Sequence, residues 1–183
     1  MKAITIKQPW ASLIVEGVKD IENRTWKTNF RGTVLIHAGE DRKLDKNPLD
    51  MVFNPKQLST LNERYTELQL CQKHDNYGVI IGSVEIVDCV INHPSIWAEK
   101  SERCQFRTCE NCEENKHRCI YYNKPIYNWV LANPIKFTQP IPAKGKLSFW
   151  EFDIVAKARE MYSNGEIKFS ELNTFEELLC NSK

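Results

Sequence analysis

Hydrophobic positions near the start of the chain follow two different periods, one after the other. Residues 2–6 alternate apolar and polar side chains in the manner of a strand. The next apolar residues are spaced as on one face of a helix: Trp10, Leu13, Ile14 and Gly17. Proline suits the first turn of a helix and glycine the position after its last turn. The pattern therefore predicts a strand and then a short helix that begins at Pro9 and ends at Gly17.

Later apolar runs predict more strands than helices. β-Branched and aromatic runs indicate strands at 33–38, 77–91, 127–137 and 147–152, of which 77–91 is expected to be central. Helical spacing predicts one amphipathic helix over 56–72, whereas 39–55 and 140–145 read as loops. Residues 158–183 read as an appended tail with one short helix at 175–179. Separated strands with two helices favour an α+β mixed barrel over a doubly wound sheet.

Polar side chains gather directly after the first predicted helix. If residues 18–26 are extended, Glu22, Arg24 and Trp26 share one face and Lys19 lies on the other with Asn23. A bend near Gly17 is then needed to bring Lys19 and Glu22 together. Such a bend would place an ammonium, a carboxylate and a guanidinium in one region of the surface.

This cluster has the chemistry of a nucleic-acid site. An arginine paired with Glu22 can grip a phosphate or a base edge, and Gln8 and Asn23 supply amide groups. Trp10 or Trp26 can provide a plane on which a base stacks. Each residue alone is also explained by a structural role, as an ion pair over a barrel end or as a core tryptophan. The set as a whole favours a binding site.

The residues from Gly17 to Arg24 resemble the G-x-K-x-x-E-x-R motif of ASCH domains, a branch of the PUA-like superfamily. Further blocks resemble the family in the expected order along residues 2–155. They are Lys7-Gln8-Pro9-Trp10-Ala11, Phe30-Arg31-Gly32 with the strand to Ala38, residues 82–89, residues 127–134 and Lys144-Gly145-Lys146-Leu147-Ser148-Phe149-Trp150. The resemblance is to the Gln-Pro-Trp-Ala type, found at the end of transcription coactivators.

The resemblance implies a PUA-like β-barrel with helices at its rim over residues 1–157. It also implies a cleft that takes RNA or DNA, single-stranded or with a flipped, modified base. Lys19, Glu22 and Arg24 would line this cleft, with Gln8, Trp10 and Ser12 beside them. Binding without catalysis is the function expected.

The alternative is a hydrolase acting on RNA or a modified nucleoside. Some compact bacterial ASCH proteins hydrolyse the amide of acetylated cytidine with the motif lysine and a threonine three residues later. Lys19 is present here, but Glu22 stands where those proteins have threonine. If the chain is an enzyme, Lys19 and Glu22 are its catalytic candidates.

A cysteine-rich insertion interrupts the predicted strands over residues 99–124. Its thiols are spaced C-x4-C-x2-C-x6-C, at Cys104, Cys109, Cys112 and Cys119. Four thiolates can hold a structural zinc ion and so order a polar loop. An exposed loop with free thiols is the alternative, and a third function class, a protein–protein adaptor, would use this loop as its contact surface.

Composition limits the remaining possibilities. The chain of 183 residues has 25 basic and 24 acidic side chains, a formal net charge of +1, so any nucleic-acid binding requires a local site. No apolar run approaches the about 20 residues that span a bilayer. Seven cysteines, an odd number, fit a reducing compartment. We therefore expect a cytoplasmic protein without a membrane partner.

Overall fold

A computed structural model describes residues 1–39, 53–66, 69, 76–101 and 125–180. Its six strands are β1 (Lys2–Lys7), β2 (Ile21–Arg24), β3 (Gly32–Gly39), β4 (Val79–Val90), β5 (Tyr127–Pro142) and β6 (Phe149–Glu151). Its helices in the described ranges are α1 (Trp10–Val15), α2 (Pro55–Arg64), α6 (Ile154–Ser163) and α7 (Phe169–Cys180). The strands form one sheet in the order β2-β5-β4-β3-β1-β6.

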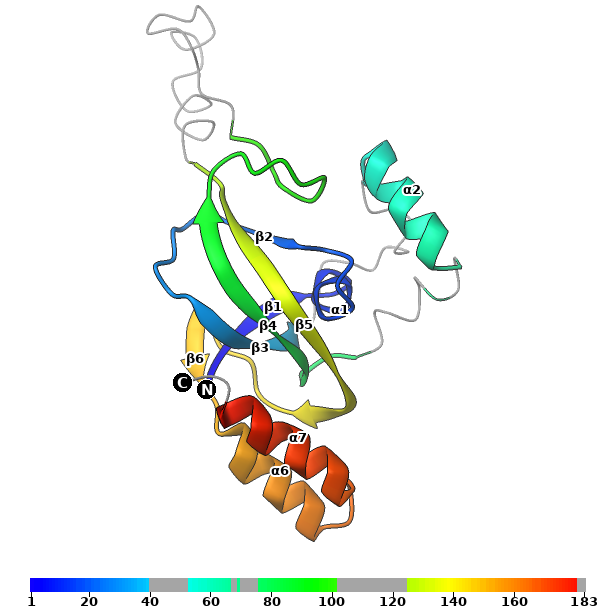
Figure 1. Ribbon diagram of the computed structural model, residues 1–183, viewed down its shortest axis with the longest axis vertical. Helices are drawn as coiled ribbons and strands as arrows, with labels where there is room; N and C mark the ends of the chain where they lie inside the picture. The colour runs from blue at the N-terminus through cyan, green and yellow to red at the C-terminus, as the bar shows by residue number, and fades with distance from the viewer. Residues whose placement is uncertain (40–52, 67–68, 70–75, 102–124, 181–183) are drawn as a thin grey trace, which may run out of the picture.

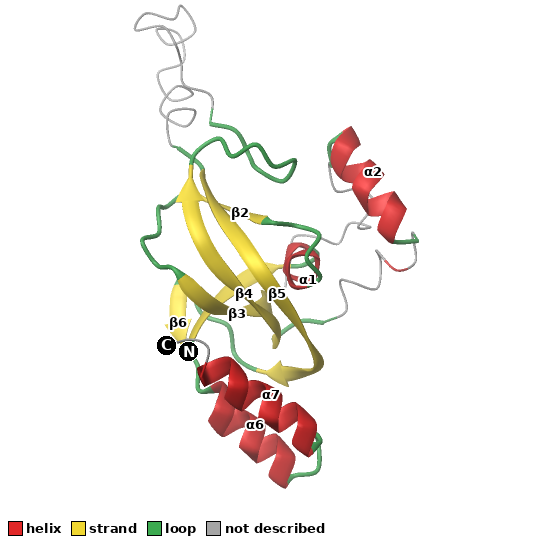
Figure 2. Cartoon of the chain, viewed as in Figure 1, coloured by secondary structure: helices red, strands yellow, loops and turns green. Residues whose placement is uncertain are grey.

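The sheet curls into a half-barrel built on the long pair β4 and β5 (Figures 1 and 2). Most neighbouring strands run antiparallel, while β1 and β3 are parallel. Apolar side chains of β1, β3 and β4 point into one core, where Ala11, Ile14 and Val15 of α1 join them. The mixed α+β half-barrel with helices beside it confirms the fold class predicted from the strand and helix pattern.

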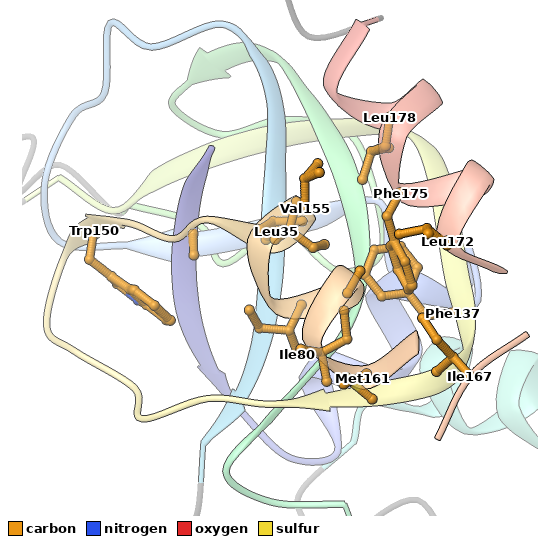
Figure 3. Packing of buried hydrophobic residues seen from close by; sticks show 14 residues of the cluster. Leu35, Ile80, Phe137, Trp150, Val155, Met161, Ile167, Leu172, Phe175 and Leu178 are labelled. Carbon is orange, nitrogen blue, oxygen red and sulfur yellow. The ribbon is translucent and has the colours of Figure 1, made fainter. Parts of the chain in front are cut away.

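A second core covers another part of the sheet and corrects the interpretation of the C-terminal residues (Figure 3). Instead of a tail over 158–183 with one short helix, the structure has two helices: α6, which begins four residues before 158, and α7, which begins at Phe169. Met161 and Phe175 are buried in the same cluster as Ile80 and Phe137 of the sheet. The prediction failed because the apolar face of these helices is stabilised by strands distant in sequence.

Three predicted boundaries also differ from the structure. The helix expected over 56–72 is shorter, because Tyr65 adopts an extended conformation (φ −137°, ψ 143°). The stretch around Pro140, expected to be a loop, continues β5 and pairs with β4, as in Ile141 opposite Ile80. The last strand begins late, since Ser148 has a positive φ of 60°, which a strand does not accommodate.

Among the described residues, no helix has the length and the apolar character that crossing a membrane requires.

Candidate functional site

The end of α1 sets the direction in which the motif leaves the helix. Gly17 has φ +70°, its N–H donates to the carbonyl of Ile14 (3.0 Å), and the N–H of Val18 donates to that of Leu13 (2.9 Å). This is a Schellman motif, in which glycine adopts the left-handed conformation at low cost. The N–H of Lys19 also donates to Leu13 (3.0 Å). The predicted bend at Gly17 is therefore present.

The bend brings Lys19 against β2. Its Nζ lies 3.1 Å from Oε2 of Glu22 and also donates to the carbonyl of Ile21. The other carboxylate oxygen of Glu22, Oε1, lies 3.0 Å from Nε of Arg24. The side chains of Lys19 and Glu22 are only 5% and 12% exposed, so solvent screens their ion pair weakly. The three charged groups form a continuous row with a net charge of +1.

Lys19 and Glu22 line a pocket of about 420 Å³. The half-buried Trp10 and the buried Trp97 form its aromatic side, with ring centroids 6.3 Å apart and planes at 73°. The ammonium of Lys19 lies 5.7 Å from the centroid of Trp10. The remaining lining residues are Asn23, Asn54, Gln57, Ile96, Ala98 and Glu99. The pocket thus combines an aromatic surface, one cation and two carboxylates.

Two amide side chains hold the segment of residues 93–99 that forms one wall. Asn23 accepts from the N–H of Glu99 (3.0 Å) and donates to the carbonyl of Trp97 (2.9 Å). Asn128 of β5, which is fully buried, donates to Asn23 (2.9 Å) and accepts from the N–H of His93 (3.0 Å). The wall is therefore fixed to β2 and β5 by hydrogen bonds rather than by strand pairing.

The start of α2 forms another part of the lining, and α2 lies on the α1 side of the sheet in Figure 1. Asn54 caps α2 through a reciprocal pair with Gln57: its Oδ1 accepts from the N–H of Gln57 (2.9 Å) and its own N–H donates to Gln57 Oε1 (3.0 Å). Gln57 Nε2 also donates to the carbonyl of Ile96 (2.8 Å), which ties α2 to the wall of residues 93–99.

The structure brings together only part of the predicted site. Trp10, Lys19 and Glu22 line the pocket, whereas Arg24 instead donates to the carbonyl of Thr5 in β1 (3.0 Å). Trp26 is partly buried and packs its ring against Trp129 of the half-barrel core at a centroid distance of 4.6 Å. Of the two tryptophans predicted for the site, Trp10 alone lines the pocket.

Gln8 and Ser12 have structural positions at α1. The side-chain oxygen of the buried Gln8 accepts from the N–H of Ser12 (3.0 Å), and its Nε2 donates to the carbonyl of Asn76 (3.2 Å). Ser12 lines a second, smaller pocket with Glu16 and Tyr65. Neither residue lines the pocket of Lys19.

Sequence reasoning did not identify Trp97, Glu99, Asn54 or Gln57. The isolated apolar group Ile96-Trp97-Ala98 within a polar stretch was a usable signal for a buried segment. Nothing in the local sequence indicates that this segment meets Asn23, more than seventy residues earlier in the chain.

The proposed zinc ligands Cys104, Cys109, Cys112 and Cys119 lie outside the described residues. Within the ranges that the structure describes, no group of three or more His, Cys, Asp or Glu side chains is placed to hold a metal ion. The zinc site therefore stays a prediction from the cysteine spacing.

Comparisons with known proteins agree with the motif. Activating signal cointegrator 1 of human and of mouse is 26% identical over 154 residues, which is 82% of this chain and 22% of each relative. The chain thus spans about a fifth of the length of these curated relatives. Crystal structures of ASCH from Zymomonas mobilis and of one of its mutants superimpose with TM-scores of 0.46 and 0.44 at 12% identity. They cover 88% of this chain and 93% and 96% of those chains, respectively.

The family model of the ASCH domain matches residues 4–141, well over half of the chain. This range includes the bend at Gly17, the charged row on β2 and the residues that line the pocket. The chain belongs to the ASCH domain family, whose PUA-like fold is generally linked to RNA binding.

Proposed function

We propose that the pocket of Lys19 and Trp10 binds one unstacked base of an RNA strand. The observation that carries this proposal is the Lys19–Glu22 pair under the half-buried Trp10 in a cavity of about 420 Å³. A volume of this size suits a small planar group and excludes a duplex. RNA recognition typically uses unstacked bases that lie on aromatic side chains.

Lys19 is equipped to donate to such a base. An ammonium has three N–H donors, and among the described residues two are used, by Glu22 Oε2 and the carbonyl of Ile21. The third is available for a ring nitrogen or a carbonyl oxygen. The carboxylate of Glu22 and the carbonyl of Ile21 both accept hydrogen bonds from the ammonium of Lys19. Lys19 is therefore a hydrogen-bond donor in this pocket, and we propose that the site binds a base without a chemical step.

The test compares two pocket variants with a matched control. Lys19→Met and Trp10→Leu keep side-chain bulk but remove the charge or the ring face. We expect each to weaken binding of single-stranded RNA about tenfold or more, since stacking on one aromatic residue contributes roughly 1–3 kcal/mol. Lys157→Met removes another lysine paired with a glutamate three residues later, on α6, and is expected to leave affinity unchanged. Fluorescence anisotropy with labelled RNA measures the dissociation constants.

Unchanged affinity in both pocket variants, with all proteins folded by circular dichroism, would contradict the proposal. The same proteins, incubated with RNA and with acetylated cytidine, are analysed for products. Turnover that disappears in Lys19→Met would replace binding with hydrolysis as the function of the pocket.

A further inference from the structure

The amide side chains around the pocket use their oxygens within the protein. Asn23 Oδ1 accepts from the N–H of Glu99 and from Asn128, and Asn54 and Gln57 accept from each other's N–H. A bound base therefore finds its strong acceptors elsewhere in the lining.

Those acceptors are the carboxylates of Glu22 and Glu99. Each oxygen of Glu22 lies beside one cation and keeps a further lone pair, because a carboxylate oxygen accepts more than one hydrogen bond. Among the described residues, the carboxylate of Glu99 has no hydrogen-bond or ion-pair partner, although its backbone is fixed by Asn23 and Asn128. Two carboxylates also disfavour a phosphate in this pocket, since like charges repel.

A donor and an acceptor lie next to each other in the lining of the pocket. Lys19 Nζ and Glu22 Oε2 are 3.1 Å apart, a spacing that two neighbouring groups on a base edge can address together. Glu99, which also lines the pocket, adds a second carboxylate. Among the charged side chains of the lining, Lys19 is thus a donor and Glu22 and Glu99 are acceptors.

From this complementarity we infer that the base bound in the pocket is guanine. Its Watson–Crick edge carries one acceptor, O6, followed by two donors, N1–H and the N2 amino group. Lys19 would donate to O6, while Glu22 and Glu99 would accept from the two nitrogen donors. The inference rests on the proposed function, because it names the base that the same site takes.

The other bases match this arrangement less well. Uracil presents two acceptors that flank one donor, and cytosine presents two acceptors and one amino group. Adenine has one amino group and a neighbouring ring acceptor, so it leaves one carboxylate without a donor. A carboxylate that a bound base covers without offering it a donor loses hydration, which costs binding free energy and is how a polar site rejects the wrong ligand.

The experiment measures the affinity of the full chain for a short oligouridine that carries one central test base. We expect guanine to bind about tenfold more tightly than adenine, cytosine or uracil, the discrimination typical of one well-placed pair of hydrogen bonds. Inosine, which lacks the N2 amino group, should lose most of this preference, and 2-aminopurine, which lacks O6 and N1–H, should lose all of it.

A substitution at Glu99 tests whether the preference for guanine comes from the pocket. Glu99→Ala should reduce the preference for guanine over inosine several-fold, whereas Glu177→Ala, an exposed glutamate on α7, should leave it unchanged. Equal affinity for all test bases, with Lys19→Met still weakening binding, would overturn the guanine inference and leave the proposed function intact. Preference for another base would do the same, and absence of RNA binding would overturn both.

Discussion

The carboxylate of Glu22 forms ion pairs with two cations, Lys19 and Arg24, which have different positions in the fold. Its Oε2 holds Lys19 at the pocket, while its Oε1 holds Arg24, whose Nη2 donates to the carbonyl of Thr5. Arg24 thereby joins β2 to β1, which lie at distant places in the sheet order. The arginine of the motif connects two distant strands of the sheet and the lysine lines the pocket, so one carboxylate contacts both a structural residue and a pocket residue.

The buried His37 predicts how stability depends on pH. Burial lowers the pKa of the imidazole below its usual 6.5, although the hydrogen bond from its Nε2 to the carbonyl of Ala143 opposes this shift. In the unfolded chain His37 therefore takes up a proton below about pH 6.5, whereas in the folded chain its imidazole stays neutral until a lower pH. We expect the free energy of unfolding to fall, with a slope of up to about 1.4 kcal/mol per pH unit, as the pH decreases from 6.5.

Urea titrations at several pH values measure this slope. His37→Gln keeps a donor for Ala143 and should flatten the dependence between about pH 6.5 and 5. The unsubstituted chain, titrated in parallel, gives the reference slope. An unchanged slope in His37→Gln would show that another group titrates in this range.

The helices α6 and α7 contribute to stability as parts of the main fold. Met161 is 2% exposed and belongs to the same buried cluster as Ile80 and Phe137 of the sheet (Figure 3). We expect Met161→Ala to lower the free energy of unfolding by about 2–5 kcal/mol, because it removes buried atoms and leaves a cavity. Tyr162→Ala changes the next residue, which is 43% exposed, and should cost much less. Thermal and urea unfolding distinguish the two, and a neutral Met161→Ala would support an appended tail.

Helices and strands could be predicted from the sequence where the contacts that determine them are local. The end of α1 follows from Gly17 and the apolar stripe before it, and the central position of β4 follows from its long β-branched run. The wall of residues 93–99 could not be predicted, since Asn23 and Asn128 fix it from two separate strands. The same reason explains why Trp97 and Glu99 were missed, while Lys19 and Glu22, three residues apart, were found.

For the whole molecule, positive and negative charges are nearly balanced. The formal net charge is +1, and the described pocket offers one cation beside two carboxylates. Affinity for RNA is therefore expected to come from stacking and hydrogen bonds to a base more than from neutralised phosphates. The dependence of RNA affinity on salt concentration therefore distinguishes contacts to a base from contacts to phosphates.

We expect the affinity for RNA to depend only weakly on salt concentration. For a single strand, the slope of log K against log salt concentration is about −0.7 for each phosphate contacted, so two or three contacts give a slope of roughly −2. Lys19→Met should weaken binding at every salt concentration without changing the slope, because its ammonium addresses a base rather than a phosphate. Anisotropy titrations over a series of salt concentrations measure both quantities. A slope of about −5 or steeper would contradict the weak dependence, and a slope that becomes shallower by about 0.7 in Lys19→Met would place Lys19 on the phosphate backbone instead of the base.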